Sequence, residues 1–372
     1  MSCDKYRILH IITSLRTGGA EQLVTDLLPR LHDRGHRAEL LLFDGTRTPL
    51  YEQLEQQGIT IYSLGCGARQ MHNPLHLFRL GKYLRKERFD IVHTHNTPCQ
   101  LLTALAAGKE APALVTTEHN TFNRRRNWRW YAALDRRMYR RYSHIICVGE
   151  KTRHNLEKRL SAGPDAPAIT TIPNGIDLDR FFQAEADTTL RTPEETDKKI
   201  IVMVAAFRPQ KDQPTLLKAM QHLPGDYRLW LAGDGTEQTA CKQLAGELGI
   251  GNRVRFWGIR SDIPALLAAA DIVVLSSHYE GMPLSGIEGM ASGKPFIASD
   301  VDGLREIAGE AGLLFPHGDS TGLAALIRQV CENPEYGADV AARCRKHVLQ
   351  YDIGTVVSRY EQIYRNILHD YK

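Results

Sequence analysis

Short apolar runs alternate with longer segments of helical periodicity along almost the whole chain of 372 residues. Runs bounded by turn residues and separated by helices are typical of β-α-β units, which build parallel sheets covered by helices on both faces. The first series of runs is RILHIITSL, AELLLFD, ITIYSL, FDIVHTH, PALVTTEH, SHIICVG and AITTIPNG. A second series is IIVMVAAF, YRLWLAGDG, RVRFWG, DIVVLSS and KPFIAS. The sequence therefore predicts an α/β protein with doubly wound sheets.

The chain is longer than one hydrophobic core normally supports, so we predict two domains. The expected boundaries are 1–175 for an N-terminal domain, 176–354 for a C-terminal domain and 355–372 for a last helix. Packing of this helix on the N-terminal domain is one arrangement that the sequence leaves open. The polar residues 183–199 fit either a connection or a surface excursion. Two doubly wound domains that face each other leave a cleft, into which the loops after the strands point.

The composition is that of an ordinary soluble globular protein, with 42% apolar and 24% charged residues. Seven scattered cysteines without a C-x-x-C pair indicate reduced thiols and a cytoplasmic protein. We expect no transmembrane anchor, because every apolar segment is too short to cross a bilayer.

The net charge of +4 conceals two unlike halves. Residues 1–170 hold 26 basic against 16 acidic side chains, and the remainder holds 21 against 27. A basic N-terminal half is compatible with nucleic acid, an anionic membrane surface or a phosphorylated substrate, and charge alone does not choose among them.

Two turns after predicted strands carry residues suited to phosphate. Gly18 and Gly19 stand between a strand and a helix, where a close backbone and free N–H groups favour anions, although a plain tight turn explains them equally well. The pattern is not G-x-G-x-x-G, which argues against a dinucleotide site. Arg208 and Lys211 follow the first strand of the second series, where cations can neutralise a leaving diphosphate.

The stretch HYEGMPLSGIEGMASGKPFIASDVDG, residues 278–303, contains two glutamates with seven residues between them. Glu280 falls in a loop and Glu288 about one turn into a helix, so both can face one pocket. Ser285 and its neighbours would present unpaired N–H groups at the helix start. On these residues alone, a surface position for Glu288 remains the simpler interpretation.

The stretch from Glu280 to Glu306 resembles the signature of retaining GT-B glycosyltransferases of family 4. Further motifs of that family follow the same order along nearly the whole chain: GGAE (18–21), HTHN (93–96), TEHNT (117–121), IPNGID (172–177), PQKD (209–212) and AGDG (232–235). The resemblance implies two Rossmann-like domains and transfer of a sugar from a UDP- or GDP-sugar with retention of configuration. It also implies that no metal or other cofactor is needed.

The resemblance further assigns roles to individual residues. Glu288 would hold the ribose hydroxyls, and Glu280, His119 and Lys211 would form the catalytic group, with Glu280 beside the transferred sugar. Lys211 would bind the diphosphate together with the Gly18–Gly19 turn. The remaining donor-binding positions would be Gly281, Met282, Pro283, Leu284 and Ser285 at the phosphates, and Gly258, Ile259 and Arg260 at the base.

One position departs from the family pattern. Alignment on Lys211 places Ala206 where many members carry an arginine. Arg208 could replace that arginine from two residues further on. Otherwise a non-catalytic nucleotide-sugar-binding subunit becomes an alternative, and a nucleotide-sugar epimerase of the same fold is another.

The segment 121–144 holds eight arginines and one acid, interleaved with aromatic residues. The arginine pairs 136/137 and 140/141 recur at helical spacing, so we predict that they line one face of a basic helix. Such a helix suits an anionic membrane surface, and a nucleic-acid partner is the weaker interpretation because no known binding module accompanies it. Inward packing of the aromatics is the alternative. We expect a glycan, lipid-linked or phosphorylated acceptor in bacterial polysaccharide or glycolipid synthesis, and a peripheral position on the cytoplasmic face of the inner membrane. The acceptor or membrane residues would be Arg124, Arg125, Arg126, Arg129, Arg136, Arg137, Arg140 and Arg141.

Overall fold

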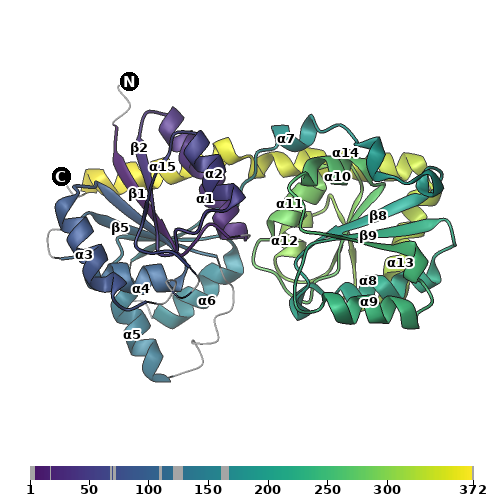
Figure 1. Ribbon diagram of the computed structural model, residues 1–372, viewed down its shortest axis with the longest axis horizontal. Helices are drawn as coiled ribbons and strands as arrows, with labels where there is room; N and C mark the ends of the chain where they lie inside the picture. The colour runs from purple at the N-terminus through teal and green to yellow at the C-terminus, as the bar shows by residue number, and fades with distance from the viewer. Residues whose placement is uncertain are drawn as a thin grey trace. The chain divides into compact units, whose positions relative to one another are not determined.

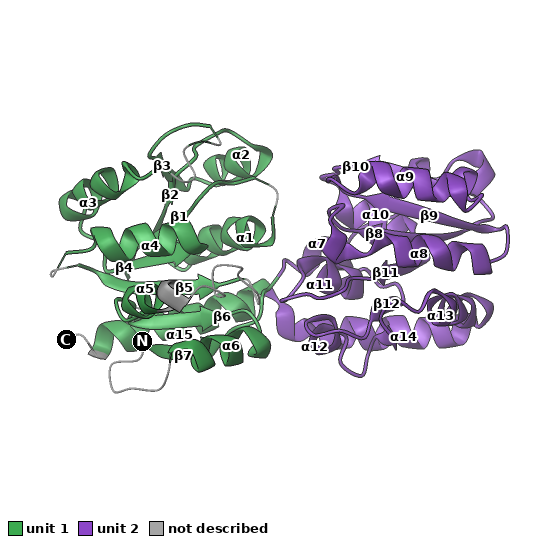
Figure 2. Cartoon of the chain, turned by 90° about the horizontal axis from the view of Figure 1, so that it is seen from below, with its two compact units in different colours: residues 1–175, 353–372 green, residues 176–352 purple. Residues whose placement is uncertain are grey.

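The computed structural model describes residues 5–16, 18–67, 69, 73–108, 111–119, 129–160 and 167–370. The chain forms two compact units, one of residues 1–175 and 353–372 and the other of residues 176–352 (Figure 2). Each unit contains one parallel sheet flanked by helices, as the alternation of apolar runs predicts (Figure 1). Both are Rossmann-like α/β units.

The first unit has a seven-stranded sheet in the order β3-β2-β1-β4-β5-β6-β7. Its strands are β1 (Arg7–Ile12), β2 (Arg37–Leu42), β3 (Thr60–Ser63), β4 (Ile91–His95), β5 (Ala113–Glu118), β6 (His144–Cys147) and β7 (Ala168–Thr171). Its helices are α1 (Gly19–Asp33), α2 (Pro49–Gln56), α3 (His76–Lys86), α4 (Thr97–Ala106), α5 (Arg129–Tyr139), α6 (Glu150–Leu160) and α15 (Ile353–Asp370).

Alternate side chains of β1 enter two different cores. Ile8 and Ile12 pack in one core with α1, α2 and α15, whereas Leu9 and Ile11 pack in a second core with α3 to α6. A strand buried on both faces needs this continuous apolar run, because successive side chains point to opposite sides of the sheet.

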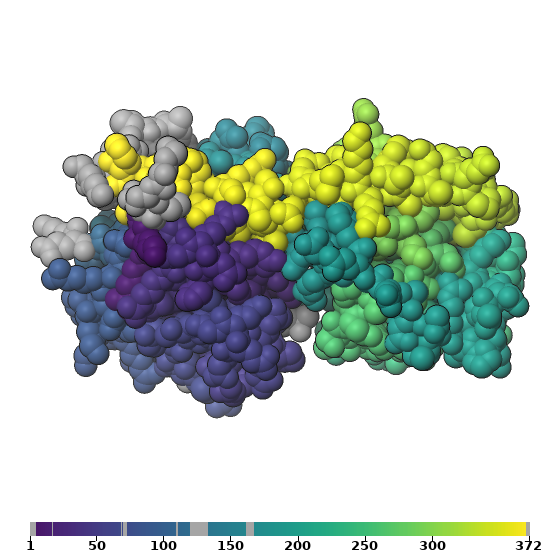
Figure 3. All heavy atoms as spheres, turned by 90° about the horizontal axis from the view of Figure 1, so that it is seen from above, coloured from purple at the N-terminus to yellow at the C-terminus, as the bar shows by residue number. Residues whose placement is uncertain are grey.

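The C-terminal helix α15 belongs to the first unit, and it begins at Ile353, two residues before the predicted start. In the space-filling view, its residues (yellow) lie against purple residues near the start of the described chain (Figure 3). Glu361 of α15 pairs with Arg34, and its Oε1 lies 2.9 Å from Nε2 of His36. Charged contacts therefore supplement the apolar packing of α15 on α1.

The second unit has a six-stranded sheet in the order β10-β9-β8-β11-β12-β13. Its strands are β8 (Lys199–Val204), β9 (Tyr227–Ala232), β10 (Val254–Gly258), β11 (Ile272–Leu275), β12 (Phe296–Ser299) and β13 (Leu313–Phe315). Its helices are α7 (Asp179–Phe182), α8 (Gln213–Ala219), α9 (Gln238–Glu247), α10 (Ile263–Ala269), α11 (Leu284–Ala291), α12 (Leu304–Ala308), α13 (Ser320–Glu332) and α14 (Pro334–His347).

The polar residues 183–199 are a surface excursion of the second unit and not a connection between units. Within them, Glu195 is buried and accepts a hydrogen bond of 3.1 Å from the indole N–H of Trp230 in β9. Composition did not reveal this contact, because a glutamate in a polar segment is normally expected to be exposed.

The strand order reverses between β1 and β4 in the first sheet and between β8 and β11 in the second. In open parallel sheets, ligands bind beyond the carboxyl ends of the strands at such switch points. The loops after β8 and β11 are therefore the natural place for a site in the second unit. Among the described residues, no helix is long and apolar enough to span a membrane.

Candidate active site

Glu280 lies in a largely buried polar cluster after β11. Its Oε1 is 2.6 Å from Nζ of Lys211 and accepts a hydrogen bond of 2.7 Å from the hydroxyl of Ser277. Its Oε2 accepts a hydrogen bond of 3.1 Å from the amide of Gln210. With only 6% of the residue exposed, this carboxylate is held in one orientation by three donors. Two segments that are far apart in sequence thus meet at one carboxylate.

Gly303 holds the backbone of the Glu280 loop. Its φ of +81° favours glycine, and a Cβ atom there would lie 2.6 Å from the carbonyl oxygen of Gly281 and 2.7 Å from that of Glu280. The N–H of Glu280 also donates a hydrogen bond of 3.3 Å to the carbonyl of Asp302. The backbone of the Asp302–Gly303 turn is therefore part of the site.

The glycines of AGDG keep the end of β9 against the loop after β8. Cβ atoms on Gly233 and Gly235 would lie 2.1 Å from the carbonyl oxygen of Ala205 and 2.2 Å from that of Phe207, respectively. Only glycine permits this approach. These two residues therefore position the segment that carries Lys211.

Asp212 anchors Lys211 from the next position in sequence. It has a left-handed backbone with φ of 47°, and its side chain caps α8 by accepting 3.3 and 2.6 Å hydrogen bonds from the N–H and hydroxyl of Thr215. The hydroxyl of Ser276 donates a 2.7 Å hydrogen bond to the carbonyl of Asp212. The cap and this link fix the direction in which Lys211 leaves the backbone.

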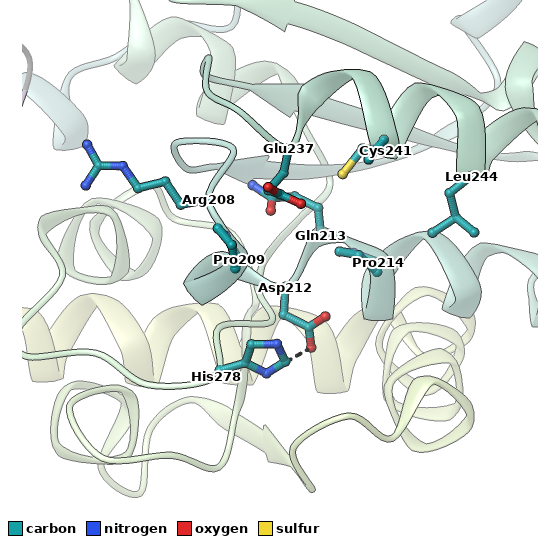
Figure 4. A pocket seen from close by; sticks show the side chains of 10 residues that line it. Arg208, Pro209, Asp212, Gln213, Pro214, Glu237, Cys241, Leu244 and His278 are labelled. Carbon is teal, nitrogen blue, oxygen red and sulfur yellow. Dashed lines mark ion pairs between the residues drawn. The ribbon is translucent and has the colours of Figure 1, made fainter.

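Arg208 is exposed beside a pocket of about 290 Å³ in the second unit. Its side chain extends away from the other residues that line the pocket (Figure 4). In the part of the chain that the structure describes, no carboxylate pairs with Arg208. Neither Lys211 nor Glu280 lines this pocket, so it borders their ion pair without containing it. The lining residues are Arg208, Pro209, Asp212, Gln213, Pro214, Glu237, Ala240, Cys241, Leu244 and His278.

Glu288 is half-buried one turn into α11, which is where the sequence pattern predicts it. A Cβ on Gly289 would meet side-chain carbons of Phe296 and Val273 at 2.9 Å, so a glycine allows α11 to lie close to the sheet. The first N–H groups of α11, at Leu284 and Ser285, point out of the helix start, as in any α-helix. The preceding donor-site residues Gly281, Met282 and Pro283 form the entry to this helix.

The predicted base-binding turn follows β10. Gly258 has φ of +67°, and its carbonyl accepts a 2.7 Å hydrogen bond from the N–H of Gly233. Ile259 is 67% exposed, whereas Arg260 lies over the ring of Trp257 at 4.6 Å and pairs with Asp262. Arg260 is thus fixed by its neighbours, and Ile259 offers an apolar surface.

The Gly18–Gly19 turn begins α1. A Cβ on Gly18 would lie 2.2 Å from Oε2 of Glu21, so the Glu21 carboxylate folds back over the helix start. An anion bound at this turn would have to displace that carboxylate, which the sequence did not indicate.

His119 follows β5 in the first unit. Its Nε2 lies 3.1 Å from Nδ1 of His95, and its buried Nδ1 has no hydrogen-bond partner among the described residues. Burial lowers the pKa of His119 to about 4, so the imidazole is neutral near pH 7. The contact with His95, inside HTHN, was not predicted.

Two family models together match most of the chain. The model described as Glycosyltransferase Family 4 matches residues 17–180, and the model described as Glycosyl transferases group 1 matches residues 188–347. The chain belongs to glycosyltransferase family 4. It is an enzyme of the glycosyltransferase class, and its two Rossmann-like units are those of the GT-B fold.

Alignments with similar proteins extend over nearly the whole length of this glycosyltransferase. The N-acetyl-alpha-D-glucosaminyl L-malate synthase of Bacillus anthracis is 26% identical, over 95% of this chain and 96% of its own. The phosphatidyl-myo-inositol mannosyltransferase of Mycolicibacterium smegmatis is also 26% identical, over 94% and 90%. The crystal structure of Anabaena HepE in complex with UDP and glucose has a TM-score of 0.85 at 23% identity, over 97% of this chain and 100% of that one. This structural likeness shows the fold.

Among the residues that the structure describes, two groups of side chains in this glycosyltransferase have ligand atoms close enough together to hold a metal ion. The nitrogens of His10, His93 and His95 lie close together, but Nδ1 of His10 and Nε2 of His95 already face each other at 3.0 Å as a hydrogen-bonded pair. Asp212 and the more exposed His278 and His317 form the second group, in which Asp212 already caps α8. Neither group includes Glu280, Lys211 or Glu288.

The arginines predicted to contact acceptor or membrane are only partly described. Arg124, Arg125 and Arg126, and the side chain of Arg129, lie outside the described residues. The prediction of one helical face for the pairs 136/137 and 140/141 is wrong, because α5 ends at Tyr139. Arg141 instead donates hydrogen bonds to the carbonyls of Ala107 and Gly108 beyond α4. Tyr139 and Tyr142 pack inward and are buried.

The sequence did not indicate the surface of α3. Phe78 is 73% exposed and Leu75 is 56% exposed, beside the exposed basic residues Arg79, Lys82, Arg85 and Lys86. We call these six residues the α3 surface. The helix was predicted, but the exposure of Phe78 was not. A sequence pattern leads one to expect every apolar residue on the buried face, so it does not reveal an apolar side chain on the exposed face.

Proposed function

We propose that this glycosyltransferase moves a sugar from a uridine diphosphate sugar to a hydroxyl acceptor, with retention of configuration and without a bound metal. The observation that carries the proposal is the pairing of Lys211 with Glu280 at the switch point of the second sheet. Lys211 and the first N–H groups of α11 supply the positive potential that a departing diphosphate needs. HepE, which has the same fold, was solved with UDP.

In this scheme, different residues of the second unit bind different parts of the donor. Glu288 accepts hydrogen bonds from the ribose hydroxyls, the Gly258–Arg260 turn borders the base, and Glu280 lies beside the transferred sugar. The bond from the anomeric carbon to the phosphate oxygen breaks as the bond to the acceptor oxygen forms on the same face. The leaving phosphate oxygen takes the acceptor proton, so no nucleophilic side chain is required.

A thermal-shift panel tests the donor. Full-length protein is heated with UDP-, GDP-, ADP- and dTDP-sugars, and a bound ligand raises the apparent melting temperature by mass action. We expect UDP-sugars to give the largest rise, and we expect Lys211→Ala to remove it. The equally basic but exposed Lys218 of α8 provides the control, since Lys218→Ala should leave the rise intact. Equal shifts for all bases would contradict the choice of UDP.

For the acceptor, we propose an anionic hydroxyl compound of bacterial glycan or glycolipid synthesis. The names of two relatives contain L-malate and phosphatidyl-myo-inositol, and both of these carry negative charge as well as hydroxyl groups. The first 170 residues of this chain are strongly basic. An anionic acceptor, either lipid-linked or a free phosphorylated or carboxylated glycan, fits this charge.

We further propose that the enzyme binds the cytoplasmic face of the membrane through the α3 surface. An exposed aromatic beside cations matches an interface of acyl chains and anionic head groups. Sedimentation with phosphatidylglycerol vesicles measures the bound fraction of the protein. We expect Phe78→Asp to lose most of that bound fraction. Arg328→Glu on α13 provides the comparison, because it removes an exposed cation outside both the α3 surface and the predicted arginine segment. Equal binding of Phe78→Asp and the wild type would remove the α3 surface from this account.

The alternatives of a non-catalytic subunit and of an epimerase do not fit the two glycosyltransferase family models that match this chain. Ala206 lacks the cation of the usual family pattern, and Arg208 points away from the pocket beside it. These two positions therefore concern how strongly the enzyme binds the diphosphate of its donor.

A further inference from the structure

Two buried histidines, His10 and His95, form a hydrogen-bonded path that reaches His119. Nδ1 of His10, in β1, lies 3.0 Å from Nε2 of His95, at the end of β4. Nδ1 of His95 lies 3.1 Å from Nε2 of His119. His93 stacks between them and the helix α15, with its ring 4.7 Å from that of His95. His10, His93 and His95 have no exposed surface.

The path begins at Tyr364 of α15. The hydroxyl of Tyr364 lies 2.6 Å from Nδ1 of His93 and 3.4 Å from Nε2 of His10. Nε2 of His93 lies 2.8 Å from the hydroxyl of Thr117. Burial lowers the pKa of His10 to about 3 and lowers those of His93 and His95 as well, so all the rings are neutral. A neutral imidazole has one N–H donor and one lone pair.

The short bond at Tyr364 sets the direction of every other bond in the path. A distance of 2.6 Å is typical of a hydroxyl donor and short for an N–H donor, so we assign Tyr364 as the donor and Nδ1 of His93 as the acceptor. Its oxygen then offers a lone pair to His10, whose Nε2 must carry the proton. Nδ1 of His10 consequently accepts from His95 Nε2–H, and Nδ1 of His95 accepts from His119 Nε2–H.

We propose that Tyr364 is a positioning residue that fixes His119 as the Nε2–H tautomer, so that its bare Nδ1 accepts a hydrogen bond from a substrate hydroxyl. The buried Nδ1 of His119 has no partner among the described residues. Because buried hydrogen-bond acceptors are nearly always paired in folded proteins, this atom is expected to bind a donor from a ligand. A sugar hydroxyl can donate to it, whereas a phosphate or carbonyl oxygen cannot. This inference rests on the proposed transfer of a sugar, but the tautomer itself does not depend on activity.

Nitrogen NMR of the full-length protein, labelled with ¹⁵N in histidine, measures the tautomer without any substrate. The signals of His119 are assigned by their loss in His119→Gln. In the wild type, we expect a protonated, pyrrole-type Nε2 and an unprotonated, pyridine-type Nδ1. Tyr364→Phe removes the hydroxyl and should bring up the second tautomer of His119.

Tyr360→Phe is the matched control. Tyr360 lies one turn earlier in α15, is just as buried, and bonds through its hydroxyl to Thr117 at 3.2 Å, outside the path from Tyr364 to His119. The Tyr360→Phe substitution should leave the His119 tautomer unchanged. With a UDP-sugar, kcat should fall about two- to tenfold in Tyr364→Phe and remain near the wild-type value in Tyr360→Phe.

Two results would overturn the inference. One is a wild-type His119 with its proton on Nδ1, which needs no variant to observe. The other is a Tyr364→Phe spectrum identical to that of Tyr360→Phe. A wild-type enzyme with the expected tautomer but no sugar transfer would instead refute the proposed function and leave the hydrogen-bond path standing.

Discussion

Nζ of Lys211 and Oε1 of Glu280 are 2.6 Å apart, although 69 positions separate the two residues in sequence. Only 16% of the lysine side chain and 5% of the glutamate side chain are exposed, so water screens this ion pair weakly. The carboxylate aims the ammonium group before any donor is bound. The negative charge of a diphosphate would then be met by a cation that is already oriented.

Neutralising Glu280 should therefore harm turnover more than donor binding. We expect Glu280→Gln to lower kcat at least tenfold and to change the donor Kd less than about threefold. Because the Lys211 ammonium loses its counter-ion, stability should fall by about 1–3 kcal/mol. Steady-state kinetics, calorimetric titration and urea unfolding measure the three effects. A fully active variant would remove Glu280 from the catalytic group.

A methyl group at Gly303 should disturb Glu280 through the backbone. Gly303→Ala places a Cβ 2.6 Å from the carbonyl oxygen of Gly281 at a positive φ, so the loop must move. We expect a loss of about 1–3 kcal/mol in stability and a lower kcat. Gly225→Ala is the control, since nothing lies within 4 Å of its Cβ position. Similar kinetics for the two variants would show that the loop tolerates displacement.

Arg208 should matter only if it takes the place of the missing arginine at position 206. In that case Arg208→Ala weakens donor binding about tenfold, the equivalent of one charge-assisted hydrogen bond. Arg328→Ala, which removes an exposed arginine on α13, should leave the donor Kd unchanged. Indistinguishable Kd values for the two variants would leave diphosphate binding to Lys211 and the α11 amides.

The buried histidines should make the protein sensitive to acid. The pKa of His10 is lowered to about 3 and that of His119 to about 4, against about 6.5 in an unfolded chain. Between those values the unfolded state binds more protons, so stability is full above pH 6.5 and falls as the pH decreases below it. Well below pH 6.5 and above its folded pKa, each such histidine lowers the free energy of unfolding by about 1.4 kcal/mol for each pH unit of acidification.

Urea unfolding between about pH 7.5 and 5.5 measures this slope. His119→Gln should make it shallower by one histidine, whereas His154→Gln, at an exposed position, should not change it. A stability that stays constant over this range would mean that the buried rings bind as many protons in the folded protein as they do in the unfolded chain.

The sequence predicted most of the fold because both units bury their strands on two faces, and the apolar runs record this directly. It also placed Glu280 in a loop and Glu288 one turn into α11, since glycine and proline mark the start of that helix. The contact between Lys211 and Glu280 could not be derived, because residue spacing does not show which loops meet at a sheet edge. The same holds for the path from Tyr364 to His119.

The arginines of α5 show a different failure. Helical spacing of the pairs 136/137 and 140/141 predicted one face, but the helix ends at Tyr139, and Arg141 bonds to carbonyl groups beyond α4. Charge spacing within a short segment carries no information about where the helix stops. The exposure of Phe78 was missed because hydrophobicity alone predicts burial.

Hydrolysis of a UDP-α-sugar with water as the acceptor tests the central claim without knowledge of the natural acceptor. Proton NMR at early times, before the free sugar interconverts its anomers, reports the configuration of the released sugar in the presence of excess EDTA. We predict the α-anomer at an undiminished rate, and no release by Lys211→Ala. Release of the β-anomer, or loss of the reaction with EDTA, would contradict a retaining and metal-independent transfer.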